Sequence, residues 1–308
     1  MGVLGDFLVY AVVRVFLGLV ALLPLRMAYA VTGRVGRLAS FLTARHLKIG
    51  LRNLAIAFPD QSSDWHLETF RRSFQRLGHL AAEVARLPRL SRARAASRVI
   101  YEAGRGLENY QQARRMGRGV LFVTAHISAW ELLPSAHALL GHPLTFVVRP
   151  LDNVFLESWT NRVRSRFGNR TLPKNNVLRD VVKVLRQHQD IGFLLDQNVQ
   201  EKEAVFAPFF GLPAATSPVV AALAIRTGAP VVAGFIYPQG RTGHYAIRFY
   251  PPIVATKQDT VPILTSQINA LIEEVIREYP DCWLWGHRRF HTQPDGRSLY
   301  EVDEVLTS

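Results

Sequence analysis

The second half of the chain restricts the fold most, because short apolar runs alternate there with segments of helical spacing. The runs expected to form strands cover residues 120–125, 145–148, 191–195, 231–236 and 246–249. Helices are expected between and after them, near residues 129–140, 154–167, 177–188, 217–227 and 262–278. The last of these has the clearest helical period, with an apolar stripe from Leu264 to Ile276. This alternation predicts an α/β layered sheet.

The N-terminal segment is the most apolar part of the chain. Residues 7–25 are apolar except for Arg14, and the run is long enough to cross a bilayer as a helix. Asp6 before the run and Pro24 after it do not fit a cleavable signal peptide. We therefore expect a membrane-anchoring helix over residues 1–27 and a single domain over residues 28–308. A buried helix of the core is the alternative.

The arginines around this segment bear on its orientation and depth. A charge such as Arg14 is costly inside a bilayer unless its side chain snorkels or the helix lies shallow. Whether the helix spans the membrane or lies in its interface therefore stays open. Arginines follow the run at positions 26, 34, 37 and 45, which favours keeping the domain on the cytoplasmic side.

The charge balance indicates an anionic partner. The net charge is +13, from 37 Lys and Arg against 24 Asp and Glu, and only five of the 37 are lysine. Arginine suits planar oxyanions, which it grips through two parallel hydrogen bonds. Residues 28–100 read as helices with basic faces, with a turn and a new helix start near Pro59 and Asp60. These faces could contact anionic lipid or simply be solvated. The single cysteine, Cys282, excludes an intrachain disulfide.

His126 and Glu131 are the candidate chemical residues. They directly follow the first expected strand of the second half, where open α/β sheets place their ligands. A carboxylate on one ring nitrogen would fix the tautomer and leave the other nitrogen to take a proton from a hydroxyl. The alternative is structural: Ser128 and Glu131 match a capping box, in which the glutamate satisfies a backbone amide.

The stretch from His126 to Glu131, HISAWE, resembles the His-(four residues)-Asp/Glu motif of glycerolipid acyltransferases, in the form found in late acyltransferases of lipid A assembly. Other blocks resemble that family in the same order. They are RNLAIAFPD at 52–60, VVRPLDN at 147–153, RSRFGN at 164–169, GFLLDQN at 192–198, FAPFFGLPAATSP at 206–218, RTGAPVV at 226–232 and WLWGHRRF at 283–290.

The resemblance implies a central mixed sheet flanked by helices and a membrane-anchored enzyme on the cytoplasmic face of the inner membrane. It implies transfer of a fatty acyl chain, from acyl carrier protein or coenzyme A as co-substrate, to a hydroxyl of an anionic glycolipid. No cofactor or metal is implied. His126 would be the general base and Glu131 its partner, although Asp196 could hold His126 instead. Similar blocks in acyltransferases of mannosylated phosphoinositides leave the acceptor open, as does a lysophospholipid.

The matching blocks also imply substrate-binding residues. Arg149 could hold a phosphate or form a surface ion pair. Phe209 and Phe210 could line an acyl-pocket rim or plug the core. Trp283 and Trp285 could form an interfacial belt or lie buried. The other expected substrate contacts are Asn153, Arg164, Gln197 and Arg288.

Two other functions fit the composition. A non-catalytic protein could use the basic face to bind anionic membranes. A nucleic-acid binder would also be basic, but no reader motif or interleaved aromatic pattern accompanies the arginines. Metal catalysis is disfavoured because the histidines show no ligand spacing, and a serine hydrolase because no G-x-S-x-G elbow occurs.

Overall fold

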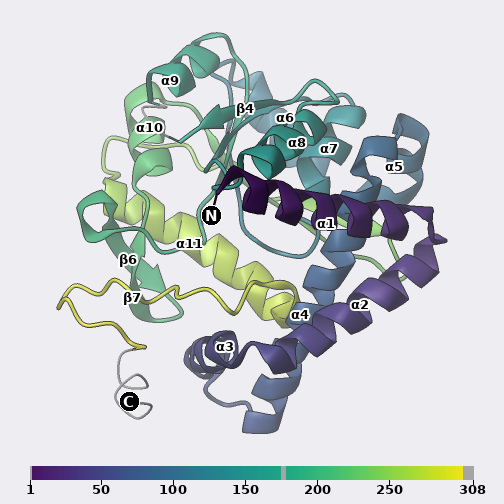
Figure 1. The fold of residues 1–308 in the computed structure, drawn as a ribbon. Coiled ribbons are helices and arrows are strands. Elements are labelled where there is room, and N and C mark those ends of the chain that lie inside the picture. Colours follow the sequence, from purple (N-terminus) through teal and green to yellow (C-terminus); the bar gives the residue numbers. More distant parts are fainter. Residues whose placement is uncertain (1, 175–177, 301–308) are drawn as a thin grey trace.

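The computed structural model describes residues 2–174 and 178–300 (Figure 1). Its centre is a seven-stranded sheet in the order β1-β9-β8-β2-β5-β3-β4. Neighbouring strands are parallel except β8 and β9. The strands are β1 (Val99–Tyr101), β2 (Leu121–Thr124), β3 (Thr145–Val148), β4 (Arg170–Pro173), β5 (Ile191–Leu194), β8 (Val231–Pro238) and β9 (Tyr245–Phe249). The predicted mixed sheet is confirmed.

All five predicted strands are present. The prediction missed β1 and β4 at the two sheet edges, and the separate antiparallel hairpin of β6 (Val205–Phe209) and β7 (Leu212–Thr216). Each predicted helix of the second half also occurs, with bounds that differ by up to three residues at either end. These helices are α7 (Leu132–Leu139), α8 (Val154–Arg164), α9 (Leu178–Arg186), α10 (Val219–Thr227) and α11 (Val261–Glu278).

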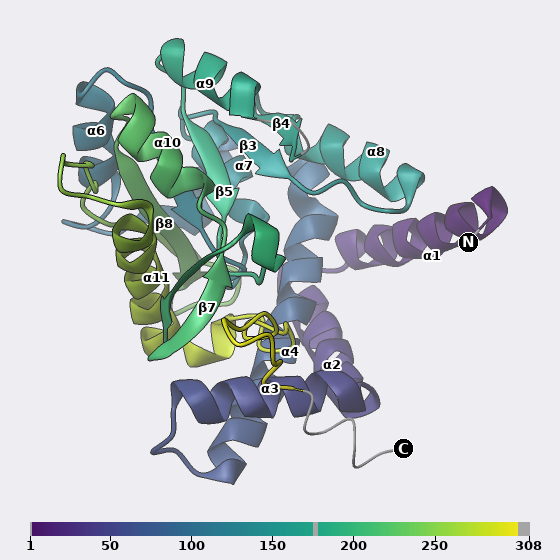
Figure 2. The same ribbon diagram turned by 90° about the vertical axis from the view of Figure 1, so that its left-hand side faces the viewer.

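Helices cover both faces of the sheet (Figures 1 and 2). An apolar core is buried on each face. Val123 and Ile191 contribute to the core that α9, α10 and α11 cover. Phe122 and Phe249 contribute to the opposite core, under α5 (Arg92–Arg98), α6 (Leu107–Arg115), α7 and α8. Alternate residues of β2 thus point to opposite faces, as the pleat of a strand requires. The described residues also include the short 3₁₀ helices η1 (Leu87–Arg89), η2 (Glu201–Glu203) and η3 (Pro280–Cys282).

Four helices form the N-terminal part: α1 (Val3–Leu22), α2 (Leu25–Leu42), α3 (Ala44–Ala57) and α4 (Ser63–Arg86). The new helix predicted after Pro59 is therefore α4, and its N-cap Ser62 accepts a hydrogen bond from the Trp65 amide. Glycines allow α2 to lie directly on α4. A Cβ at Gly36 would lie 2.2 Å from the Phe74 carbonyl oxygen, and one at Gly78 would lie 2.0 Å from the Thr32 carbonyl oxygen. A side chain at either position would push the helices apart.

One side of α1 packs against α8 (Figures 1 and 2). The ring of Phe155 lies 5.5 Å from that of Phe7, and Asn153 donates to the Asp6 carbonyl at 2.7 Å. The Arg14 guanidinium lies over the Trp159 ring, 4.8 Å from its centroid. Arg14 therefore contacts the protein, so the apolar side of α1 carries no charge from this residue.

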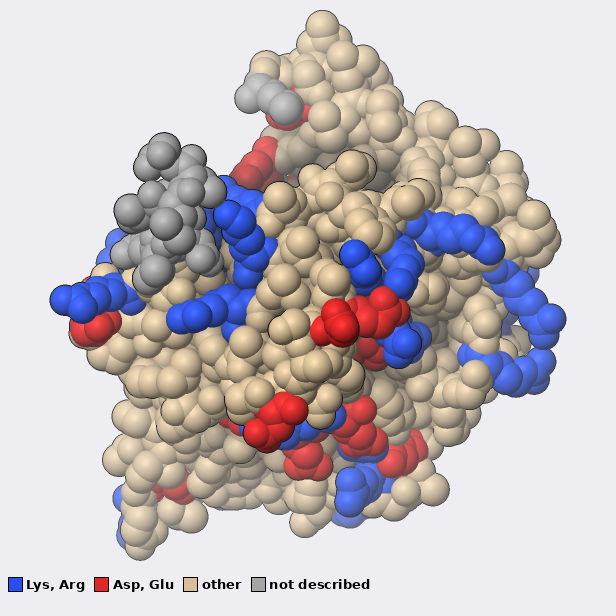
Figure 3. All heavy atoms as spheres, turned by 90° about the horizontal axis from the view of Figure 1, so that it is seen from below, with Lys and Arg blue, Asp and Glu red and all other residues tan. Residues whose placement is uncertain are grey.

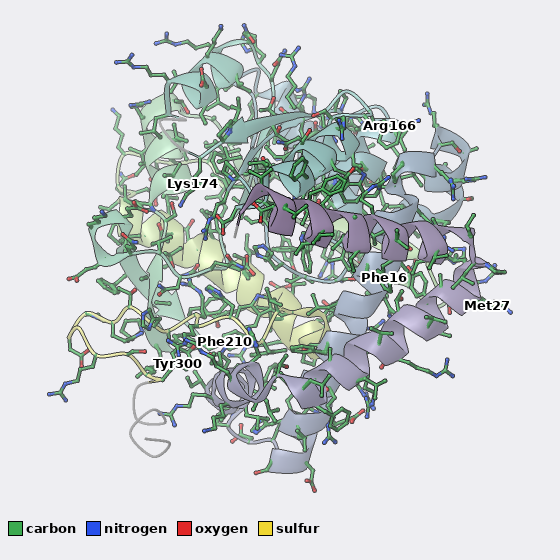
Figure 4. The ribbon with its side chains drawn as sticks, in the orientation of Figure 1. Phe16, Met27, Arg166, Lys174, Phe210 and Tyr300 are labelled. Carbon is green, nitrogen blue, oxygen red and sulfur yellow. The ribbon has the colours of Figure 1, made fainter. Side chains whose placement is uncertain are left out.

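The exposed surface of α1 is largely apolar, whereas α2 exposes apolar residues together with Arg26 and Arg34. Exposed apolar residues of α2 recur at helical spacing and form what we call the α2 stripe: Met27, Val31, Val35, Leu38 and Leu42. Met27 lies at the outer corner where α1 meets α2 (Figure 4). Among the described helices, Val3–Leu22 is long and apolar enough to cross a membrane, with a mean hydropathy of 2.1. Seen from below, broad areas lack charged side chains, and Lys and Arg gather along the right-hand edge (Figure 3).

Candidate active site

The register of two neighbouring strands brings His126 and Asp196 together. β2 and β5 are parallel, and Thr124 pairs with Leu194 at their carboxyl ends. His126 and Asp196 each stand two residues beyond that pair, so they leave the same edge of the sheet side by side. Sites of open α/β sheets form at this edge.

Asp196 holds His126 through two hydrogen bonds. The His126 Nδ1 lies 2.9 Å from the Asp196 Oδ1, and the backbone amide of His126 donates to Oδ2 at 3.0 Å. The Trp283 Nε1 donates to the same Oδ2 at 2.8 Å. Because a buried carboxylate accepts, the ring carries its proton on Nδ1 and leaves Nε2 as an acceptor. The His126 side chain keeps 22% of its surface exposed, whereas that of Asp196 keeps 2%.

The two groups shift each other's pKa. Burial alone would lower the pKa of His126, but the negative charge and hydrogen bond of Asp196 outweigh burial and raise it above its usual value. Burial would raise the pKa of Asp196, yet the His126 charge and the hydrogen bonds from His126 and Trp283 lower it to about 2. Asp196 is therefore ionised at neutral pH and favours the protonated form of His126.

Glu131 has a different partner. Its carboxylate forms a two-point ion pair with Arg164 of α8, in which Arg164 Nε donates at 3.0 Å and Nη2 completes the pair. The hydrogen-bond partner of His126 is thus Asp196, which was one of the two alternatives. Arg164, expected to contact substrate, is held by Glu131.

The structural alternative, a capping box formed by Ser128 and Glu131, is wrong. α7 begins at Leu132 with Glu131 at the N-cap position and no side-chain cap. Ser128 has a φ of 54° and its amide donates to the Cys282 carbonyl at 2.8 Å. Left-handed backbone is unfavourable for serine and often occurs at functional sites, where the surrounding structure holds it in place.

An apolar pocket lies between the carboxyl halves of β2, β3 and β5 and helix α7. It has a volume of about 60 Å³ and is lined mainly by aliphatic and aromatic side chains, with the Glu131–Arg164 pair and Trp130 in its wall. The Trp130 ring lies 5.2 Å from that of His126, edge to face. Gly192 also lines the pocket, so no side chain at that position fills it.

The remaining expected substrate residues lie in several places. The Arg149 side chain is 74% exposed, and its Nη2 lies 3.7 Å from the Asp152 Oδ1. This is the surface ion pair that the sequence offered as the alternative to a phosphate contact. Asn153 caps α8 and ties it to α1. Gln197 directly follows Asp196 and is partly buried. Arg288 is partly buried in the C-terminal segment.

Phe209 and Phe210 are buried, which is the core-plug alternative. Phe209 contacts the Trp283 ring at 5.7 Å, and the guanidinium of Arg289 lies over it. An acyl-pocket rim that enters lipid would need exposed rings. The expectation of such a rim is therefore wrong, and both side chains belong to the core. Trp283 and Trp285 are also buried and form no interfacial belt.

Trp283 is a site residue to which the sequence assigned no role at the site, although burial was one of its two alternatives. Its indole donor satisfies the Asp196 oxygen that also accepts the His126 amide. The one sequence signal for Trp283 was its position in a block that resembles the family, and this block does not indicate a hydrogen bond to Asp196. Among residues 2–174 and 178–300, no group of three His, Cys, Asp or Glu side chains could hold a metal ion.

Comparison of the sequence with known proteins gives the same kind of protein in every match reported below. The family model described as bacterial lipid A biosynthesis acyltransferase matches residues 2–292. The lipid A biosynthesis lauroyltransferase of Escherichia coli K12 is 28% identical over 289 residues, 91% of this chain and 90% of the relative. The palmitoleoyltransferase of the same organism is 28% identical over 266 residues, covering 86% and 85%. Its myristoyltransferase is 24% identical over 277 residues, covering 90% and 85%.

Proposed function

The chain belongs to the bacterial lipid A biosynthesis acyltransferase family and is an acyltransferase, and we propose that it moves a fatty acyl group from acyl carrier protein to a hydroxyl of a lipid A precursor. The observation that carries this proposal is the His126–Asp196 pair beside an apolar pocket. Such a pair can activate a hydroxyl, and the pocket offers an apolar chain a place next to it.

In the proposed reaction, His126 acts as general base. Its Nε2 takes the proton of the acceptor hydroxyl while that oxygen attacks the thioester carbonyl. The new C–O bond forms, the C–S bond breaks, and the proton passes from the imidazolium to the leaving thiolate. Asp196 keeps the ring oriented through Nδ1 and stabilises its positive charge when it forms.

The apolar lining of the pocket supports an acyl donor, and its volume of about 60 Å³ has room for part of an acyl chain. Burying each methylene of such a chain contributes about 0.8 kcal/mol, so a narrow apolar pocket distinguishes chains by length. The pocket lies beside Trp130, which contacts His126, so a chain within it could place its carboxyl carbon near the base.

Gly192→Ala is expected to shift the preference toward shorter acyl chains. A Cβ at this position would lie 3.4 Å from both Leu144 Cδ1 and Phe146 Cβ, so the strand tolerates it while the pocket loses space. If the pocket loses room for one methylene, the binding energy of a chain that is one methylene longer falls by about 0.8 kcal/mol. The kcat/KM for the longer chain, relative to that for the shorter one, should therefore fall about fourfold. Competition between acyl carrier protein thioesters, read by mass spectrometry, measures the shift. Gly18→Ala is the control, since no atom lies within 4 Å of its added Cβ. An unchanged profile would remove the pocket from the donor site.

We also propose that the protein lies on the cytoplasmic face of the inner membrane, with α1 and the α2 stripe in the lipid. α1 packs along α8, whose polar residues Glu157, Asn161 and Arg162 would be costly inside hydrocarbon. A perpendicular span would carry part of α8 into the bilayer with it. An interfacial position instead puts the exposed sides of α1 and α2 into lipid and leaves α8 in water.

Leu38→Glu is expected to weaken binding to vesicles. Leu38 lies in the middle of the α2 stripe, and burying a leucine side chain contributes about 1.5–3 kcal/mol. Its replacement by a charge therefore reduces partitioning by roughly tenfold or more. Vesicle co-sedimentation measures this. Ile263→Glu on α11 is the matched control, because it makes the same change at an exposed helical position outside the stripe. Equal losses in both variants would refute this orientation.

The proposed reaction is tested with purified full-length protein, acyl carrier protein thioesters and a panel of lipid acceptors. The expected product is a lipid A precursor one acyl group heavier, identified by mass spectrometry. Acylation of a lysophospholipid or a mannosylated phosphoinositide, with none of the lipid A precursor, would reject the proposed acceptor. Transfer from acyl-coenzyme A but not from acyl carrier protein would reject the proposed donor.

A further inference from the structure

A second hollow lies on the other side of the turn that follows β2. It has a volume of about 370 Å³, and its walls come from α2, α4, the turn at Ser128 and Ala129, and the loop between β8 and β9. The loop is held in place, because Arg98 Nε donates to the Gly243 carbonyl at 2.7 Å. A Cβ on Gly243 would lie 2.7 Å from Leu25 of α2, so the loop and α2 are in close contact. The hollow is therefore part of the folded structure and not a gap between mobile segments.

The lining of this hollow is positively charged. Arg26, Arg76 and Arg241 line it, and no Asp or Glu is among its described lining residues. Arg76 is neutralised by Asp281, whose Oδ2 lies 2.9 Å from the Arg76 Nη2. Within residues 2–174 and 178–300, Arg26 and Arg241 form no ion pair. Two guanidinium groups thus face a hollow that lacks a counter-charge.

The acids nearest to the hollow do not supply that counter-charge. Asp281 forms an ion pair with Arg76. Glu83 accepts hydrogen bonds from Arg98 and from Tyr29 in the wall behind the hollow. Both carboxylates already have cationic partners. The two remaining guanidinium groups therefore favour an anion that enters from outside the protein.

Uncharged polar side chains in the same walls also lack partners. Within the described parts of the chain, the side chains of Gln75, His79 and Thr242 make no hydrogen bond. Burial, with a contribution from the Arg76 charge, lowers the pKa of His79 to about 4, so the ring is neutral and keeps one N–H donor. Its ring stacks on that of Tyr29 with centroids 4.8 Å apart. An anion in the hollow could accept from Gln75, His79 and Thr242 as well as from the arginines.

The position of the hollow indicates that its ligand is a lipid. Arg26 and Ala30 of α2 line the hollow, while their neighbours Met27 and Val31 belong to the α2 stripe. One side of α2 therefore faces the hollow with the charge of Arg26, and the adjacent side carries the apolar α2 stripe. We propose that the hollow binds the phosphate group of an anionic membrane lipid whose chains lie along the α2 stripe. This site is separate from the pocket beside His126, and it rests on the proposed membrane position of α2.

The test uses the full chain, phosphatidylcholine vesicles with and without phosphatidic acid, and the double variant Arg26→Gln/Arg241→Gln. Phosphatidic acid is expected to strengthen binding of the original protein, and the double variant is expected to lose at least tenfold more of that gain than a matched control that also lacks two arginines. The matched control is Arg34→Gln/Arg45→Gln, which removes two exposed charges from α2 and α3 outside the hollow. A basic residue near an anionic surface contributes about fivefold wherever it stands, so this control measures the general charge effect.

Thr242→Val distinguishes binding at a specific site from general attraction to a charged surface, because it removes a hydroxyl from the hollow without changing the charge. A loss of phosphatidic acid preference in this variant supports the proposal, and equal losses in the two double variants would overturn it. Inorganic phosphate distinguishes the source of the phosphate. Weak stabilisation of the folded protein by inorganic phosphate, against strong vesicle binding, supports a lipid, whereas equally strong binding of free phosphate would reject one. None of these measurements involves acyl transfer, so their failure is distinct from a failure of the proposed reaction.

Discussion

His126→Ala is expected to reduce acyl transfer by about 10²–10⁴-fold, the usual contribution of a positioned general base. The variant keeps the backbone amide that donates to Asp196, so the turn after β2 retains one of its two bonds to that carboxylate. What disappears is the ring nitrogen that we propose accepts the hydroxyl proton. Initial rates with acyl carrier protein thioester and a lipid A precursor measure the loss.

His46→Ala serves as the control for this experiment, since His46 is exposed and lies outside both pockets. His126→Asn is a second variant, because an amide can still bond to Asp196 but cannot act as a base at neutral pH. Transfer at the original rate by either variant of His126 would contradict the proposed role. Circular dichroism establishes that each variant is folded.

Asp196→Asn is expected to lower kcat/KM by about 10²–10⁴-fold and to move the acid limb of its pH profile to lower pH. His126 must be neutral to accept a proton, so the rate rises as pH increases through its pKa. The Asp196 charge raises that pKa against the effect of burial. Without the charge, burial dominates and the pKa falls, so the neutral ring persists to lower pH. A merely structural role for Asp196 would lower the rate without moving the limb.

Glu131→Gln is the comparison variant for this prediction. The Glu131 charge also raises the pKa of His126, but it acts less strongly than Asp196 and without a hydrogen bond to the ring. The acid limb should therefore move in the same direction by a smaller amount. Loss of the ion pair with Arg164 should lower the midpoint of thermal unfolding. A larger shift of the limb in Glu131→Gln than in Asp196→Asn would identify Glu131 as the main partner of His126.

Local sequence pattern was sufficient to predict most of the sheet. The five predicted strands are buried or half-buried apolar runs, and their alternation with amphipathic helices needs no long-range information. β1 and β4 were missed because they lie at the two edges of the sheet and are partly exposed, so neither is a continuous buried apolar run. β6 and β7 were missed because prolines interrupt both, so the segment reads as a turn.

The partners of the site residues could not be predicted in the same way. Glu131 lies five residues from His126, yet its ion pair is with Arg164, 33 residues further along the chain. Asp196 is 70 residues from His126, and only the parallel register of β2 and β5 shows that they meet. The positive φ of Ser128 also defeats the capping pattern, because a backbone held by a distant carbonyl overrides a local preference.

The bond between Trp283 and Asp196 has a consequence for the newly made chain. Asp196 and Trp283 are 87 residues apart, so the carboxylate acquires this partner only after residue 283 has been synthesised. Ser128 likewise depends on the Cys282 carbonyl to hold its turn. A chain that ends before residue 282 lacks both contacts: the Ser128 amide loses its carbonyl partner, and Asp196 Oδ2 keeps only the bond from the His126 amide. Such chains should be inactive, so the acyltransferase becomes competent only after the segment around Trp283 has folded onto the site.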